Sequence, residues 1–176
     1  MLKAQSVSFG LKGGLNVSSA RVSNTANFDP RISFHAGGLA HIHLTKQFAI
    51  QPELVYSAQG FKNGSNDVYR FNYVNVPVLV QYMFNNGFRL QTGPQVGLML
   101  TGKRDNGTTT LDVKDGYKDV AFDWSFGAGY LVPKTGFGID ARFNLGIAKL
   151  NESTGSDLRS GVIQVGVFYM FDQHYK

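Results

Sequence analysis

The sequence predicts an all-β protein, a transmembrane antiparallel up-and-down β-barrel of eight strands. Apolar and polar residues alternate with period two in eight segments, as in strands with one apolar and one polar face. Short connections between the segments alternate with long ones. No Asp, Glu, Lys or Arg lies on the apolar face of any segment. A run of about 18 apolar residues, which a transmembrane helix needs, is missing from the sequence. We therefore predict that strands, and not helices, cross the membrane.

Composition narrows the class further. The 176 residues fit one domain, which we assign to residues 1–176. The chain has no Cys, which excludes disulfides, thiol chemistry and Cys-based metal sites. Its net charge of +5 is spread along the chain and forms no basic stripe, so nucleic acid is not an expected partner. Residues 1–5 lack an apolar stretch and are interpreted as a tag or the remnant of a signal peptide.

Residues 136–148 show the alternation most clearly. Phe137 and Phe143 fall on one face, and Asp140 and Arg142 fall on the other. A helix with this sequence would place both charged residues among apolar ones, so the strand is favoured. The same pattern predicts seven further strands, at about residues 7–17, 32–44, 48–59, 73–84, 88–100, 120–132 and 163–171.

The apolar faces of these strands are expected to point outwards. An eight-stranded barrel has an interior only wide enough for side chains to fill it. Several Phe, Leu or Ile per strand would overpack that space, whereas the Gly, Ser and Asn of the polar faces fit it. One Lys or Arg in contact with lipid at the midplane costs about 2–4 kcal/mol, which explains an apolar face without charge. Segments of about 10 residues, tilted by about 40°, span the roughly 25 Å of the apolar band.

The connections give the orientation of the barrel. Tight turns rich in Gly, Asn and Thr alternate with longer polar connections, which is the usual pattern of short periplasmic turns and longer extracellular loops. Aromatic residues near the strand ends are interpreted as interface girdles, and the girdle beside the short turns is the better defined. The short turns are predicted at residues 45–47, 85–87 and 133–136, and the long loops at 18–30, 62–70, 102–118 and 151–160.

Three prolines lie inside predicted strands, where each removes a hydrogen-bond donor from the ladder. We expect bulges or local strand irregularities at Pro52, Pro77 and Pro94.

Five segments, taken together, resemble a known family. They are the first strand FGLKGGLNVS, the third QPELVYS, the fourth VNVPVLV, the fifth GPQVG and the seventh GIDARFNLG. These segments are similar to those of the PorT-type outer-membrane β-barrel family of Bacteroidetes, in the same order along the chain. The resemblance implies an outer-membrane barrel. Members of the family are described as porin-like, and the name-giving relative is linked to protein secretion and gliding, but most members have no assigned activity.

The last strand resembles the terminal signal that the outer-membrane assembly machinery recognises in its substrates. The elements of this assembly signal are Gln164, Gly166, Tyr169 and Phe171. The tail at 172–176 follows the final aromatic residue and leaves the signal slightly internal. The resemblance implies that the barrel-assembly machinery is a partner during biogenesis.

Nine titratable residues fall on the inward faces of the predicted strands. Six are charged, three of each sign, and three are His. Because an unpaired buried charge is costly, we predict a charge-balanced network that plugs the interior. The alternative is a polar pore lining or a proton-sensitive gate. The predicted interior network consists of Lys12, His35, His41, His43, Glu53, Arg89, Asp123, Asp140 and Arg142.

No pattern in the sequence indicates a cofactor, a metal or catalysis. His41 and His43 share a face, but two imidazoles without an identifiable third ligand do not predict a metal site. Ser33, His35 and Asp123 could serve a lipid-modifying enzyme near the outer rim, yet no spacing rule supports them. We therefore predict no cofactor, no metal and no enzyme activity.

Three functions are left open by the sequence. The first is a structural or interaction barrel, a subunit of a larger envelope or secretion complex. The second is porin-like passage of small or apolar solutes, and the third and most distant is a lipid-modifying outer-membrane enzyme. The expected partners are outer-membrane lipid, lipopolysaccharide and other envelope proteins, with the loop at 102–118 as a candidate contact surface. The expected location is the bacterial cell outer membrane.

Overall fold

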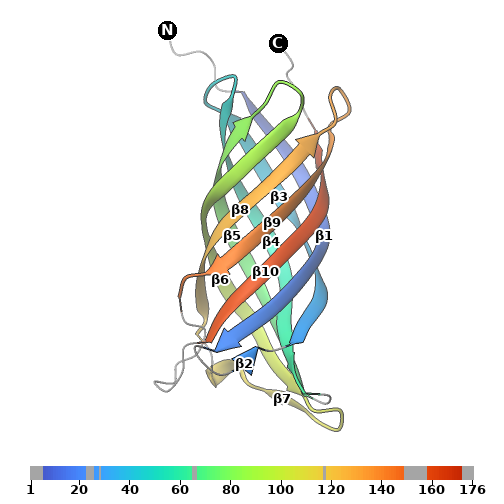
Figure 1. The fold of residues 1–176 in the computed structure, drawn as a ribbon, viewed down its shortest axis with the longest axis vertical. Coiled ribbons are helices and arrows are strands. Elements are labelled where there is room, and N and C mark those ends of the chain that lie inside the picture. Colours follow the sequence, from blue (N-terminus) through green and yellow to red (C-terminus); the bar gives the residue numbers. More distant parts are fainter. Residues whose placement is uncertain are drawn as a thin grey trace.

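The computed structural model is a closed antiparallel β-barrel with steeply tilted strands (Figure 1). It describes residues 6–22, 26–27, 29–64, 67–116, 118–148 and 158–171. Its elements are, in chain order, β1 (Val7–Val22), β2 (Ala26–Asn27), β3 (Asp29–His43), β4 (Phe48–Asn63), β5 (Asp67–Met83), β6 (Phe88–Asp105), β7 (Thr110–Asp112), the short 3₁₀ helix η1 (Lys114–Gly116), β8 (Val120–Leu131), β9 (Phe137–Gly146) and β10 (Leu158–Met170). Within the described residues, no helix is long and apolar enough to cross a membrane.

Eight long strands form the wall of the barrel. Each pairs with the next long strand along the chain, and β10 pairs with β1 from Gly10–Met170 to Val22–Leu158, which closes the ring. Closure removes the two free edges that an open sheet would expose to lipid. The short strands β2 and β7 only extend the ends of β1 and β6. The predicted eight-stranded barrel is confirmed.

The apolar face of each strand points outwards and the polar face points into the lumen, as the sequence predicts. Phe122, Phe143 and Val78 point outwards and are 51%, 40% and 42% exposed, whereas Asp140 and Arg142 are buried inside. Exposed and buried residues alternate strictly along β9 and along most of β6. The outer surface of the barrel is therefore apolar where it would contact acyl chains, and the polar stripes line the interior.

Aromatic rings gather at the end of the barrel where the short turns join the strands, which we call the turn end. The opposite end, which carries the longer connections, is the loop end (Figure 1). Aromatic rings contact each other at the turn end, both between neighbouring strands and along the same segment of chain, with centroid distances of 4.7–5.7 Å. The residues of this rim are Phe48, Tyr82, Phe84, Phe88, Phe137, Tyr169 and Phe171.

The strands extend further at the loop end than the sequence predicts. The predicted loop at 62–70 is mostly a paired hairpin, because β4 continues to Asn63 and β5 begins at Asp67. The predicted loops at 18–30 and 102–118 are also shortened by the adjoining strands. In this hairpin the alternation of inward and outward side chains continues, and Tyr69 and Phe71 point inwards. The strands therefore extend beyond the apolar band. Most of the predicted loop at 151–160, and the segments 1–5 and 172–176, lie outside the described residues.

The prolines interrupt the ladder without causing bulges. Pairing is interrupted at Pro52 between β3 and β4, at Pro77 between β4 and β5, and at Pro94 between β5 and β6. The register is the same on both sides of each interruption, so the expected irregularities occur but the expected bulges there are wrong. The register shifts lie elsewhere, after Pro30 on β3 and before Tyr73 on β5.

Candidate functional site

Four charged side chains meet in the middle of the barrel interior, and we call them the ionic quartet. The Arg142 guanidinium on β9 donates two hydrogen bonds to the Glu53 carboxylate on β4, Nη1 to Oε2 and Nη2 to Oε1, both at 2.9 Å. Lys12 Nζ on β1 lies 2.8 Å from Asp140 Oδ2 and 3.4 Å from Glu53 Oε2. Arg142 Nη2 lies 3.4 Å from Asp140 Oδ2, which completes a cycle of opposite charges.

The ionic quartet crosses the lumen. In the ring of eight strands, β4 and β9 are diametrically opposed, with three strands between them on either side. The bidentate Arg142–Glu53 contact therefore spans the interior from wall to wall. Two positive and two negative charges cancel, and all four side chains are at most 8% exposed. A buried cycle of this kind compensates the desolvation that each isolated charge would suffer.

A chain of neutral hydrogen bonds lies on the loop side of the quartet. Ser125 Oγ donates to Asn144 Oδ1 at 2.7 Å, and Asn144 Nδ2 donates to Gln164 Oε1 at 3.0 Å. Gln164 Nε2 donates to Asn16 Oδ1, and Asn16 Nδ2 donates to Ser57 Oγ, both at 3.0 Å. This amide belt links β8, β9, β10, β1 and β4 and forms a second polar layer inside the barrel.

The three His residues of the predicted network lie at different levels. His35 Nδ1 lies 2.8 Å from Asn16 Oδ1 of the amide belt. His41 Nδ1 lies 3.2 Å from Gln51 Oε1, and the rings of His41 and His43 meet edge to face at 4.6 Å between centroids. His43 lies near the turn end and is only half-buried, so it does not belong to the closed interior.

Arg89 and Asp123, the two other predicted interior charges, lie at opposite ends of the lumen. The Arg89 guanidinium stacks over the Phe168 ring near the turn end, 5.3 Å from the ring centroid. Asp123 Oδ2 accepts a hydrogen bond of 2.9 Å from Gln95 Nε2 on the loop side. Gln95 lies six positions after Arg89 on β6, which is about 20 Å of strand. The structure thus brings four of the six interior charges together and keeps these two apart.

An apolar cluster, which we call the mouth cluster, fills the interior at the loop end. It consists of Phe61, Phe71, Tyr73, Met99 and Ala121. The aromatic rings of this cluster were not predicted as a site, because the predicted strands end at residue 59 and begin again at residue 73 and so leave out Phe61 and Phe71. The alternation of Tyr69, Phe71 and Tyr73 was the available signal.

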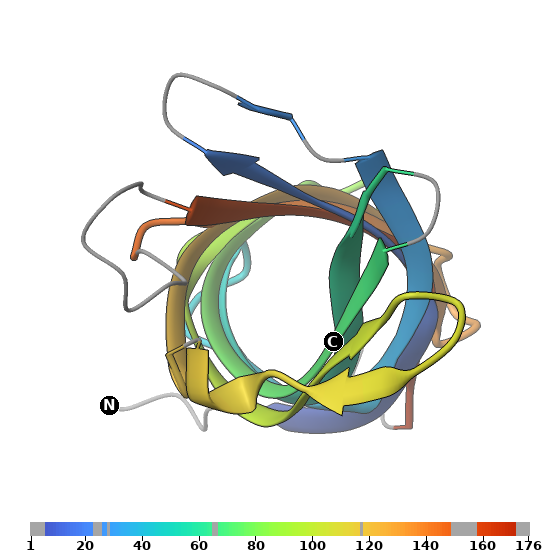
Figure 2. The same cartoon turned by 90° about the horizontal axis from the view of Figure 1, so that it is seen from below.

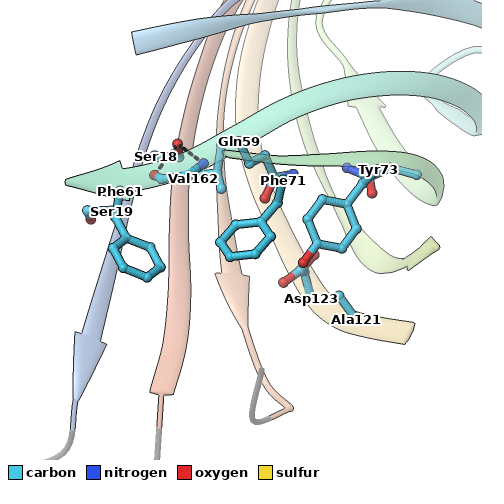
Figure 3. A pocket seen from close by; sticks show the side chains of 11 residues that line it. Ser18, Ser19, Gln59, Phe61, Phe71, Tyr73, Ala121, Asp123 and Val162 are labelled. Atoms are coloured by element: carbon cyan, nitrogen blue, oxygen red, sulfur yellow. Dashed lines mark hydrogen bonds between the residues drawn. The ribbon is translucent and has the colours of Figure 1, made fainter. Parts of the chain in front are cut away.

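A cavity of about 20 Å³ adjoins the mouth cluster (Figure 3). It has room for about one water molecule. The cavity is lined by both aromatic rings and polar side chains, and Figure 3 draws the Asp123 carboxylate beside the Tyr73 ring. Its lining residues are Ser18, Ser19, Gln59, Gly60, Phe61, Phe71, Tyr73, Asn75, Ala121, Asp123 and Val162.

The assembly-signal residues divide between the two faces of β10. Gln164 points inwards into the amide belt, whereas Tyr169 and Phe171 point outwards into the aromatic rim of the turn end. Gly166 pairs with Gly14 at the β1–β10 closure. All four residues of the signal therefore make structural contacts in the folded barrel.

The residues considered for catalysis take part in separate contacts. Ser33 Oγ donates to the backbone oxygen of Ala58 at 2.6 Å, while His35 and Asp123 have the contacts to Asn16 and Gln95 given above. Among the described residues, no group of three or more His, Cys, Asp or Glu is placed to hold a metal ion.

A closed barrel with an apolar outer surface, an aromatic rim and a buried ionic interior defines an outer-membrane β-barrel. Solved structures share this fold. The Ail protein of Yersinia pestis is 16% identical, with a TM-score of 0.60 over 93% of this chain and 98% of that chain. Neisserial surface protein A (NspA) is 16% identical, with a TM-score of 0.61 over 94% of this chain and 99% of that chain.

The chain belongs to the outer membrane protein beta-barrel domain family, whose model matches residues 3–152. No curated protein matches the chain in sequence. The protein is thus a small barrel of the bacterial outer membrane with buried polar residues. In such barrels the loop end faces the exterior of the cell and the turn end faces the periplasm.

Proposed function

We propose that the protein is a structural and interaction barrel with an occluded lumen, and that it has no enzyme activity. The observation that carries this proposal is the ionic quartet, which joins diametrically opposed strands by a bidentate contact with both oxygens at 2.9 Å. The amide belt adds a second layer across the same lumen. A solute moving along the barrel axis would have to break charge-assisted bonds in a site of low dielectric.

Single-channel recording in planar bilayers tests the occlusion. We expect no reproducible open state for the wild-type barrel at neutral pH. A variant with smaller side chains in the quartet, Arg142→Ala with Glu53→Ala, keeps the charge balance and should open a measurable conductance. A stable open state of the wild-type protein would support the second candidate, porin-like passage of small or apolar solutes, and would contradict the plugged interior. Mass spectrometry of bilayer lipids incubated with the protein addresses the lipid-modifying alternative.

The proposed partners are other envelope proteins and lipopolysaccharide at the loop end. The paired hairpins there raise charged side chains above the apolar band, including the ion pairs Arg70–Asp105 and Arg104–Asp67. Photo-crosslinkers at Thr108 on the loop end and at Thr135 on the turn end, used in native membranes, would capture partners at either end. An interaction role predicts the same adduct in repeated preparations from one of the two positions, and it is contradicted when neither position gives one.

We further propose that the chain lies in the PorT-type branch of its family, and so in Bacteroidetes. The strand segments FGLKGGLNVS, QPELVYS, VNVPVLV, GPQVG and GIDARFNLG support this placement. The proposal extends to the barrel-assembly machinery as the partner during biogenesis, through Gln164, Gly166, Tyr169 and Phe171. In an in vitro assembly reaction, Phe171→Ala should slow insertion into membranes that contain the machinery and leave spontaneous folding in detergent nearly unchanged.

A further inference from the structure

The wall of the barrel has a gap in its ladder at the loop end. Residues 31–34 of β3 form no pairs with residues 58–60 of β4, although pairing holds on both sides of this stretch and the register shifts across it. The same residues of β3 stay paired to β1, and those of β4 stay paired to β5. The gap is therefore confined to one edge, which we call the β3–β4 seam.

Side chains replace the missing backbone bonds across the seam. Ser33 Oγ donates to the backbone oxygen of Ala58 at 2.6 Å, and Arg31 Nη1 donates to the backbone oxygen of Gln59 at 2.8 Å. Rotation of the Ser or Arg side chain breaks such a bond without moving either strand, whereas a ladder bond breaks only when the strands separate. The seam is thus closed by contacts that can open locally.

Gly60 lets β4 leave the wall at this point. Its φ of +152° is a conformation that other residues rarely adopt, and a Cβ there would overlap the backbone oxygen of Tyr69. The loop end of β4 lies inside the ring, while the ends of β1 and β3 flare outwards (Figure 2). Ser18 Oγ on β1 then reaches Gly60 directly, accepting from its nitrogen at 2.9 Å and donating to its oxygen at 2.8 Å.

The seam separates the cavity at the mouth cluster from the bilayer. Gln59 and Gly60 of the seam also line the cavity, together with Ser18 of β1, which is hydrogen-bonded to Gly60 (Figure 3). On the outer side of the seam, Ile32 and Phe34 are 70% and 53% exposed.

We propose that the mouth cluster binds a small aromatic molecule with one hydrogen-bond donor, and that this molecule exchanges with the outer leaflet through the β3–β4 seam. Phe61 and Phe71 line the cavity, and their rings already stack with Tyr69, so an aromatic guest would add to an existing group of aromatic contacts. Asp123, Asn75 and Gln59 also line the cavity, and their side chains carry oxygens that can accept a hydrogen bond from its donor group.

The amide belt and the ionic quartet restrict the path by which this molecule can enter and leave. The amide belt and the ionic quartet close the lumen on the periplasmic side of the cavity. A guest at the mouth can therefore leave towards the exterior or sideways, and not along the axis. Because the cavity has room for only about one water molecule, the seam has to widen before an aromatic ring fits.

A disulfide across the seam tests the proposal. Because the chain has no Cys, the variant Ser33→Cys with Ala58→Cys carries a single possible disulfide. Trp124→Phe removes the only native Trp, and Phe71→Trp places a reporter in the mouth cluster. The probe is 4-bromophenol, whose heavy atom quenches Trp fluorescence on contact, added to the full-length barrel in phospholipid nanodiscs. We expect saturable quenching of the reduced protein and loss of that quenching after oxidation.

The control pair is Ala128→Cys with Ala141→Cys, which lie directly opposite each other in the intact β8–β9 ladder. Oxidation of this pair should leave the quenching unchanged. Absence of saturable quenching in the reduced seam variant, or equal quenching in its two redox states, would overturn the proposal. Phe61→Trp is the second reporter where the Phe71 variant does not fold.

Phospholipids with brominated acyl chains test the lateral route separately. They should quench the mouth-cluster Trp less after the seam is oxidised. In a seam variant that keeps Trp124 and lacks the reporter, Trp124, which faces the bilayer, should be quenched equally in both redox states. Quenching of the reporter that does not depend on the disulfide would show that the seam is not the route.

Discussion

Removal of the Arg142 charge tests the ionic quartet directly. Arg142→Met leaves the Glu53 carboxylate with one cationic neighbour, Lys12 Nζ at 3.4 Å. The quartet then carries a net charge of −1, because Lys12 alone opposes Glu53 and Asp140. Removal of one partner from a buried ion pair costs about 3–5 kcal/mol, so we expect the free energy of unfolding to fall by about that amount.

Glu53→Gln should cost a similar amount, since it leaves a net charge of +1 in the same place. The double variant restores a net charge of zero, and its cost should be smaller than the sum of the single costs by about 1–3 kcal/mol. Urea titration in lipid vesicles measures these values through the fluorescence of Trp124, the only Trp of the chain, which is 37% exposed on the outer surface.

The matched control is the surface pair Arg70–Asp105, which joins Nη2 and Oδ2 at 3.3 Å with side chains that are 53% and 29% exposed. Arg70→Met and Asp105→Asn should each cost at most about 1 kcal/mol. Additive losses at Glu53 and Arg142, or single losses no larger than those of the surface pair, would refute the reasoning about the quartet.

Three further predictions concern other layers of the barrel. Gly138→Val should lower the folded fraction on heat-modifiability gels, because a Cβ there overlaps the Phe168 ring, and Phe168→Ala in the same chain should restore it. Asn16→Ala removes the residue that joins the amide belt to Ser57 and should cost about 1–3 kcal/mol in the urea assay; a neutral result would contradict the belt. Val78→Arg, at the middle of a lipid-facing stripe, should cost about 2–4 kcal/mol, whereas Leu44→Arg beside a turn should cost about 1 kcal/mol or less. Equal costs at these two positions would contradict the assigned depth of the band.

The wall of the barrel could be predicted because period two fixes the side of each residue. Asp140 and Arg142 alternate with Ile139 and Phe143, so the register with the neighbouring strands does not change which face each residue occupies. The cost of a charge in lipid then decides which face is outside. These two arguments use only local spacing, and both hold in the structure.

The contacts inside the lumen could not be predicted, because they depend on height along the barrel axis as well as on side. Arg142 and Glu53 are 89 residues apart and meet through the stagger of diametrically opposed strands. Arg89 and Asp123 face the same lumen as the quartet and lie at its two ends. Sequence spacing gives no value for this stagger, so a charge-balanced interior was predictable and its pairing was not.

The extent of the strands at the loop end is a further limit. Lys62 and Arg70 were interpreted as loop residues because polar residues between strands usually mark a turn. In the structure both lie in the β4–β5 ladder, at pairs Lys62–Val68 and Gly60–Arg70. Beyond the apolar band the outer face of a strand contacts water and no longer needs to be apolar. Only the inward aromatic residues then carry the strand signal.

Asn16 explains why an opening at the β3–β4 seam would stop at the amide belt. Its Nδ2 donates to Ser57 Oγ in the belt at 3.0 Å, and also to the backbone oxygens of Ala58 at 2.7 Å and Phe34 at 3.0 Å, which border the seam. The ladder resumes immediately below, at the pair His35–Ser57. Widening of the seam therefore costs the side-chain bonds of Ser33 and Arg31 first, and further separation has to break the belt and the ladder together. The barrel can thus yield at its mouth while the interior stays closed.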